Sequence, residues 1–210
     1  MSKSTLALAL AGLLLGVTPS AAQNLLVNPT FTSDTSGWLA GNFDPTQDAS
    51  GNPPGSAMLL NTAAGGATTT LMFQCFNGAT PGATYAFGGS VRLSRAAGEV
   101  TTGDGRIALG WNSAPNCLFA NSLGVDEAGA IVQLDSWLPL SSTAVAPAGT
   151  VSVAVFLSVR KNEAGGSFQG NFDDPFLQLQ AAVPALGAGP LALLAVALGM
   201  TAWLRLRNPV

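Results

Sequence analysis

Reactive side chains are sparse in this sequence. It contains no histidine, which removes the commonest general base, the Ser-His-Asp triad and most zinc sites. A glycosidase needs only two carboxylates at a set separation, but Glu99, Glu127 and Glu163 each lie in a Gly- and Ala-flanked stretch typical of a solvated loop. The Gly-Gly pairs do not form a phosphate-binding loop motif. The sequence therefore indicates a protein that is not an enzyme.

The elements that position the remaining polar residues are predicted to be β-strands. Short apolar segments alternate with Gly, Pro, Asn and Asp turns, no helical period is visible from 23 to 182, and the stretch 39–56 is predicted to be a long surface loop. This pattern predicts an all-β fold, a sandwich or jelly roll. The predicted strands are 24–31, 57–61, 68–76, 84–94, 106–112, 130–134, 137–145, 151–160 and 172–180.

Alternation within these strands predicts a core face and an outer face. The apolar odd-numbered positions of 85–93, 107–111 and 151–159 are expected in the core, so Trp111 is interpreted as a core residue. The other positions are small and polar, and they leave room for a ligand to which Arg92, Asn112 and Gln74 would offer hydrogen bonds. An ordinary solvated sheet face is the alternative interpretation.

Charge and cysteine content narrow the possible partners and the compartment. Residues 23–182 hold eleven acidic and five basic side chains, a formal charge of −6, which argues against nucleic acid and anionic lipid as partners. The chain has two cysteines, Cys75 and Cys117, which we expect to form a disulfide in an oxidising compartment, with two free buried thiols as the alternative.

Four sequence segments together resemble a known fold family, the galactose-binding-like jelly rolls. Within it the chain is most similar to the carbohydrate-binding modules appended to bacterial xylanases and glucanases. The segments are Asn-Leu-Leu-Val-Asn-Pro-Thr-Phe at 24–31 with Gly37-Trp38, Pro-Gly-Ala-Thr-Tyr at 81–85, Trp137 before Ala-Pro-Ala-Gly at 146–149, and Asn-Phe-Asp-Asp-Pro-Phe-Leu at 171–177.

This resemblance implies a polysaccharide ligand and a structural calcium. Sugar rings stack on flat aromatic side chains, so Trp38 and Trp137 join the predicted ligand-binding residues, with core packing as the alternative for both; Phe43, Phe119 and Phe168 are possible rim contacts. The predicted ligand-binding residues are thus Gln74, Arg92, Asn112, Trp38 and Trp137. The calcium ligands implied by the resemblance are Asn28, Thr30 and Asp173, with Asp44 and Asp48 of the long loop as alternative ligands. The other interpretation is that Asp173 and Asp174 are polar residues ending a strand.

The two ends of the chain are predicted to be a signal peptide and a membrane anchor. Lys3, an apolar run at 6–17 and Ser-Ala-Ala at 20–22 predict a signal peptide over 1–22, cleaved between Ala22 and Gln23. The uncharged run 186–204 is long enough to cross a bilayer as one helix, and arginines follow it. The residues that define this predicted anchor, 183–210, are Val183, Pro184, Leu186, Arg205 and Arg207.

The tail also resembles the C-terminal sorting signals of Gram-negative bacteria, of the Ile-Pro-Thr-Leu and Pro-Glu-Pro types. That resemblance implies recognition by a membrane-embedded sorting peptidase, with a plain membrane anchor as the alternative. The predicted protein is an exported envelope or surface protein whose sandwich, 23–182, binds carbohydrate. The alternative is a structural surface or matrix protein without a ligand.

Overall fold

The computed structural model describes residues 22–50, 55–94 and 100–180. In these ranges nine strands form two sheets, and two single-turn 3-10 helices, η2 (Pro115–Cys117) and η3 (Phe119–Asn121), lie between β5 and β6. The strands are β1 (Asn42–Asp44), β2 (Ser56–Asn61), β3 (Thr68–Asn77), β4 (Thr84–Leu93), β5 (Gly103–Asn112), β6 (Ser122–Ile131), β7 (Leu138–Val145), β8 (Ser152–Lys161) and β9 (Phe168–Leu179).

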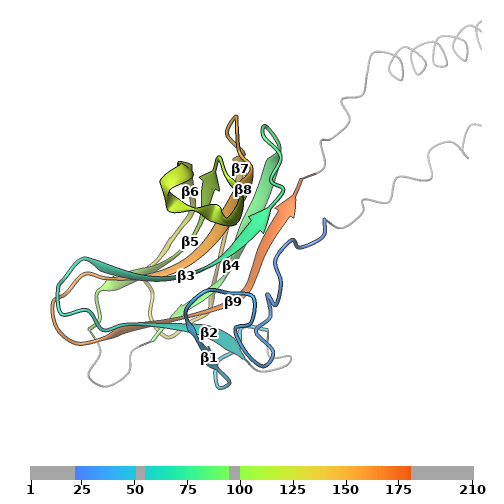
Figure 1. The fold of residues 1–210 in the computed structure, drawn as a ribbon. Coiled ribbons are helices and arrows are strands. Elements are labelled where there is room, and N and C mark those ends of the chain that lie inside the picture. The colour runs from blue at the N-terminus through green and yellow to red at the C-terminus, as the bar shows by residue number, and fades with distance from the viewer. Residues whose placement is uncertain (1–21, 51–54, 95–99, 181–210) are drawn as a thin grey trace, which may run out of the picture. The chain divides into compact units, whose positions relative to one another are not determined.

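The two sheets pack face to face around one core (Figure 1). The five-stranded sheet has the order β1-β2-β9-β4-β7, and the four-stranded sheet has the order β3-β8-β5-β6. All of these strand pairs are antiparallel. The predicted all-β sandwich is confirmed.

The alternating positions fill the core as predicted. The odd-numbered residues of β4 and β8 are buried, and Ile107 and Leu109 of β5 are fully buried between the sheets. Trp111 is 1% exposed and its Nε1 donates to Asp126 Oδ2 at 2.6 Å, so it is a core residue. Val151 is the exception at 40% exposure, because it precedes β8. Each fully buried large aliphatic side chain stabilises the fold by about 1.5–3 kcal/mol.

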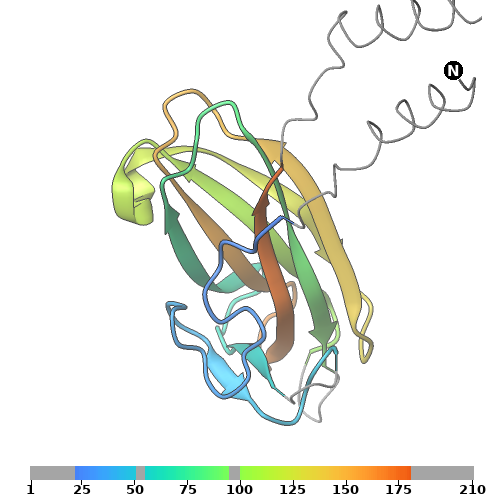
Figure 2. The same ribbon diagram turned by 90° about the vertical axis from the view of Figure 1, so that its right-hand side faces the viewer.

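The segment predicted as the first strand, 24–31, is not a strand. It makes one isolated bridge, from Asn24 to Gln178 of β9, and then turns where Asn28 and Phe31 adopt left-handed backbone conformations. Further on, Leu39 bridges to Phe73 of β3. The segment therefore runs from one sheet to the other, and Figure 2 shows its first part alongside β9.

Other boundaries also differ from the prediction: β5 begins at Gly103 instead of 106, and β9 begins at Phe168 instead of 172. The strand predicted at 130–134 is β6, which starts earlier, at Ser122. Most of β6 is exposed on both faces and its pairing with β5 has register shifts, so it lacks the apolar alternation that reveals a strand. The predicted loop 39–56 contains the short strand β1.

The disulfide is confirmed, since Cys75 of β3 is bonded to Cys117 of η2. The predicted signal peptide, apart from Ala22, and the whole predicted anchor, 183–210, lie outside the described residues. Among the residues that are described, we find no helix that is both long and apolar enough to span a membrane.

Candidate functional site

The outer face of the four-stranded sheet carries the candidate site. Because the odd-numbered residues of β8 face the core, its even-numbered residues, Phe156, Ser158 and Arg160, lie on the outside. In register with them stand Phe73 on β3 and Arg106 on β5. Three strands that are distant in sequence thus contribute side chains to one surface.

Three rings form what we call the phenylalanine cluster, Phe73, Phe119 and Phe156. Phe119 stacks on Phe156, with ring centroids 5.8 Å apart and an interplanar angle of 22°. Phe73 contacts both, edge-on to Phe119 at 5.9 Å and tilted against Phe156 at 5.6 Å. Phe119 is nevertheless 63% exposed, so a large aromatic surface is held open to solvent.

Glycines in both sheets make room for aromatic rings, Gly110 in the four-stranded sheet and Gly88 in the five-stranded sheet. A Cβ at Gly110 would lie only 2.5 Å from Cε2 of Phe156, and a Cβ at Gly88 would lie 2.9 Å from the ring of Phe176. The space left by these glycines is therefore filled by neighbouring side chains of the protein, and this differs from the prediction that it receives a ligand.

The loop that carries Phe119 is fastened to the sheet. The disulfide joins Cys117 to β3, and the Cys117 backbone N–H donates to Ser152 Oγ at 3.2 Å. Ser152 Oγ in turn donates to the Ala114 carbonyl at 2.7 Å, and the Asn116 N–H donates to Asn77 Oδ1 at 2.8 Å. These bonds set the position of Phe119 before any ligand arrives.

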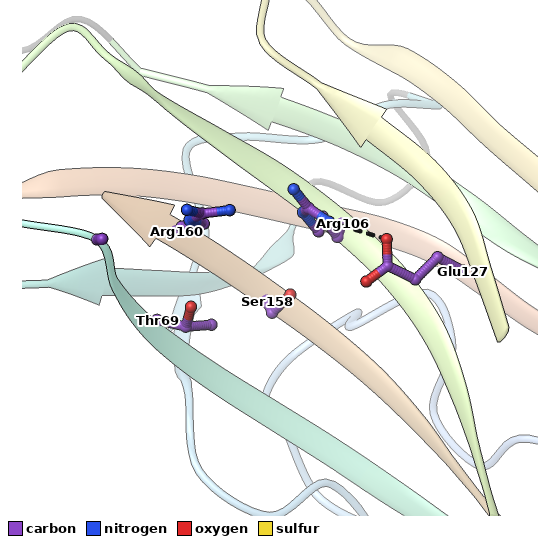
Figure 3. A pocket seen from close by; sticks show the side chains of 6 residues that line it. Thr69, Arg106, Glu127, Ser158 and Arg160 are labelled. Atoms are coloured by element: carbon purple, nitrogen blue, oxygen red, sulfur yellow. Dashed lines mark hydrogen bonds and ion pairs between the residues drawn. The ribbon is translucent and has the colours of Figure 1, made fainter. Parts of the chain in front are cut away.

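Beside the cluster lies a hollow of about 320 Å³, which we call the arginine hollow (Figure 3). Successive even residues of β8 are about 6.7 Å apart, so the Cα atoms of Phe156 and Arg160 are separated by about 13 Å. The face is therefore elongated, with rings at one end and polar groups at the other. The hollow is lined by Ala67, Thr69, Arg106, Glu127, Ser158 and Arg160.

The two arginines of the hollow differ in their surroundings. Arg106 donates from Nε to Asp104 Oδ1 at 2.5 Å and from Nη1 to Glu127 Oε2 at 2.8 Å. The hydrogen bond to Asp104 is the largest cause that raises the pKa of Arg106, so this cation is fixed in place. Within the described part of the chain, the side chain of Arg160 has no hydrogen bond or ion pair.

Three of the five predicted ligand-binding residues have internal roles. Trp38 is 8% exposed, packs against Phe31 with the two rings tilted, and donates from Nε1 to the Val27 carbonyl. Gln74 is buried beneath the N-terminal segment, where it accepts from Val27 N–H at 2.7 Å and donates to the Val27 carbonyl at 2.9 Å. Asn112 is buried and donates to the Gly110 carbonyl.

The other two predicted residues are not on this face. Arg92 belongs to β4 of the five-stranded sheet, where it lines a separate hollow of about 290 Å³ and lies 3.9 Å from Asp135. Trp137 is half-buried just before β7 of the same sheet. The structure therefore does not bring the five predicted residues together in one groove.

The residues implied as calcium ligands also fail to converge. Asn28 donates to the Asp34 carbonyl and Thr30 lies against Thr32, whereas both carboxylate oxygens of buried Asp173 accept backbone N–H groups, from Ala49 and Asp174. In the described ranges, no group of three or more His, Cys, Asp or Glu side chains is placed to hold a metal ion. These three residues do not fit as one calcium site, and calcium binding stays a prediction.

Sequence reasoning missed most of the face that the structure assembles. Phe119 was identified as a possible rim contact, but Phe73 and Phe156 were not singled out, and Phe168, another such candidate, is fully buried. The available signal was the alternation in β8, since Phe156, Ser158 and Arg160 alternate with the buried residues Val155, Leu157 and Val159.

No protein-family model matches the sequence, and no curated protein matches it. The fold, however, is similar to solved structures. The CBM22-1 xylan-binding domain of Paenibacillus barcinonensis Xyn10C matches over all of its length and 79% of this chain, with a TM-score of 0.51 and 17% identity. A family 16 carbohydrate-binding module matches over 99% of its length and 73% of this chain, with a TM-score of 0.50 and 18% identity.

A third similar structure is the enzymatically active domain of tailspike protein 4 of bacteriophage CBA120. It matches over 75% of this chain with a TM-score of 0.54 and 14% identity. The chain spans about a fifth of that domain, since 21% of its length is matched. At such identities these likenesses show the fold alone, and that fold is the β-sandwich of carbohydrate-binding modules.

Proposed function

We propose that the sandwich binds polysaccharide on the outer face of the four-stranded sheet. The observation that carries the proposal is Phe119, a ring that is 63% exposed yet fixed by stacking and by a disulfide two residues away. A sugar ring has an apolar face, which suits an aromatic surface, and hydroxyl edges, which suit Thr69, Ser158 and the arginines of the hollow. The fold shared with carbohydrate-binding modules supports the same function.

We also propose that the protein acts at the cell envelope or surface. The N-terminal signal-peptide pattern and the apolar tail support export to the cell envelope or surface and retention by one C-terminal helix before any processing. A sorting peptidase that recognises the tail is the partner suggested by its resemblance to sorting signals. A disulfide within the sandwich agrees with an oxidising compartment.

The test is binding of the full chain, disulfide intact and in a detergent without a sugar headgroup, to a broad array of polysaccharides. Phe119→Ala should weaken any binding at least about tenfold, or 1.4 kcal/mol, because it removes the exposed half of the stacked pair. Val145→Ala, at an exposed position of the five-stranded sheet, is the matched control and should bind normally. A blank array from a folded protein would reject this function and favour the structural surface role.

A further inference from the structure

Arg160 differs from the other basic side chains that the structure describes. Arg92 lies near Asp135, Arg106 is held between Asp104 and Glu127, and Lys161 is buried among backbone carbonyls. Arg160 is exposed at the edge of the arginine hollow and, among described residues, its guanidinium has no partner.

A carboxylate lies beside Arg160 on the neighbouring strand, but another arginine already binds it. Asp104 stands directly opposite Arg160 in the β5–β8 register. Its two oxygens instead accept from Nε and Nη2 of Arg106, at 2.5 and 3.3 Å, and the aspartate is only 6% exposed. Because Arg106 already binds both oxygens of Asp104, Arg160 is left to line the hollow, where Figure 3 shows it beside Arg106.

A guanidinium in such a place fits a carboxylate, since its parallel N–H groups match the two oxygens. We infer that the polysaccharide bound by this face carries carboxylate groups, as uronic acids do, and that Arg160 binds one of them; this inference rests on the proposed function. The phenylalanine cluster then receives the apolar face of another sugar of the same chain, about 13 Å away.

The remaining charges limit how acidic the ligand can be. Residues 23–182 carry a formal charge of −6, and Glu127 lines the same hollow. A polymer with a charge on every sugar would be repelled by this field. The ligand class is therefore a mostly neutral polysaccharide with isolated carboxylates, whose neutral sugars meet the hydroxyls of Thr69 and Ser158.

The experiment compares polysaccharides before and after chemical reduction of their carboxylates to alcohols, which keeps the backbone and removes the charge. Glucuronoxylan, gum arabic and xanthan are suitable probes, measured by calorimetry with the full chain. We expect at least about fivefold tighter binding of one or more acidic forms than of their reduced forms, and a smaller difference at high salt. Arg160→Gln should remove the difference while leaving binding of the reduced form unchanged.

Ser141→Glu is the control for net charge, because it makes the chain more negative by one unit at an exposed position of the five-stranded sheet. It should keep the preference for the acidic form. Equal affinity for each acidic polymer and its reduced form, or an equal loss for both in Arg160→Gln, would overturn the inference and leave the proposed function standing. Failure to bind any of the six polymers, together with a blank array, would reject the proposed function itself.

Discussion

Phe119 stacks on Phe156 at 5.8 Å although the two rings come from different elements, η3 and β8, which only the fold brings together. The disulfide fixes this relationship, because Cys117 precedes Phe119 by two residues and is bonded to β3. The bond therefore has two effects that experiments can separate, one on stability and one on the shape of the face.

Replacing both Cys75 and Cys117 by alanine should lower the free energy of unfolding by about 4 kcal/mol on the chain-entropy model, since the bridge closes a loop with a sequence separation of 42. Urea unfolding of the full chain measures this. At a temperature where the variant is still folded, polysaccharide binding should also fall, because the loop can move Phe119 off Phe156. Adding Phe119→Ala should then cost little more; an undiminished further loss would show that the disulfide does not position the ring.

Gly110→Ala should displace the Phe156 ring on the outer face of the four-stranded sheet. The new Cβ would meet Phe156 at 2.5 Å, so the ring must move, and we expect a loss of about 1–3 kcal/mol in stability together with weaker binding. The matched control is Gly65→Ala, whose nearest neighbour would be Thr68 Cγ2 at 3.7 Å, an ordinary contact. Thermal unfolding of the two variants measures the difference, and equal stabilities would contradict the close packing at Gly110.

The core and the disulfide were predictable from sequence because each leaves a local or compositional signal. Alternation identified the buried positions of β4, β5 and β8, and two cysteines in a domain predicted to be exported indicated a bridge. The phenylalanine cluster has no such signal. Phe73 and Phe156 meet only because β3 and β8 pair in one particular register, which no pattern within either strand specifies.

The predicted ligand-binding residues lie apart in the structure for the same reason, because tertiary contacts and not patterns within one strand decide their places. Gln74 and Trp38 are polar or aromatic residues that, taken alone, suit a binding surface. Both are covered by the N-terminal segment, whose path depends on left-handed residues at Asn28 and Phe31 rather than on any strand period. Arg92 and Asn112 occupy similar positions within their own strands, but the strands belong to opposite sheets.

The buried carboxyl group of Asp173 should make the free energy of unfolding depend on pH. Burial, reinforced by the charges of Asp174 and Asp48, raises its pKa from 3.8 to about 6. The folded state therefore holds this proton more tightly than the unfolded chain, so the stabilisation is complete below about pH 4 and is lost as the pH rises through 6. Between pH 4 and 7 this group should lower the free energy of unfolding by on the order of 2 kcal/mol.

Asp173→Asn should remove that decline, which urea unfolding at a series of pH values measures. Asp34→Asn is the control. Its exposed carboxylate accepts hydrogen bonds from Ser36, which lower its pKa, so its own contribution is lost as the pH falls and the decline toward neutral pH should persist. An unchanged decline in Asp173→Asn would assign the pH dependence to other groups.

Lys161 holds two loops together from inside the protein. It is fully buried, and its Nζ donates to the carbonyls of Gly165 at 2.9 Å and Gly166 at 3.1 Å and to that of Ala63. Lys161→Met keeps most of the apolar stem but leaves these acceptors without their donor, so we expect a loss of about 3 kcal/mol in urea unfolding. Arg160→Gln, one residue earlier and exposed, should change stability by less than about 0.5 kcal/mol. Similar stabilities for the two variants would mean that the ammonium group contributes no net stabilisation, because its desolvation cancels its hydrogen bonds.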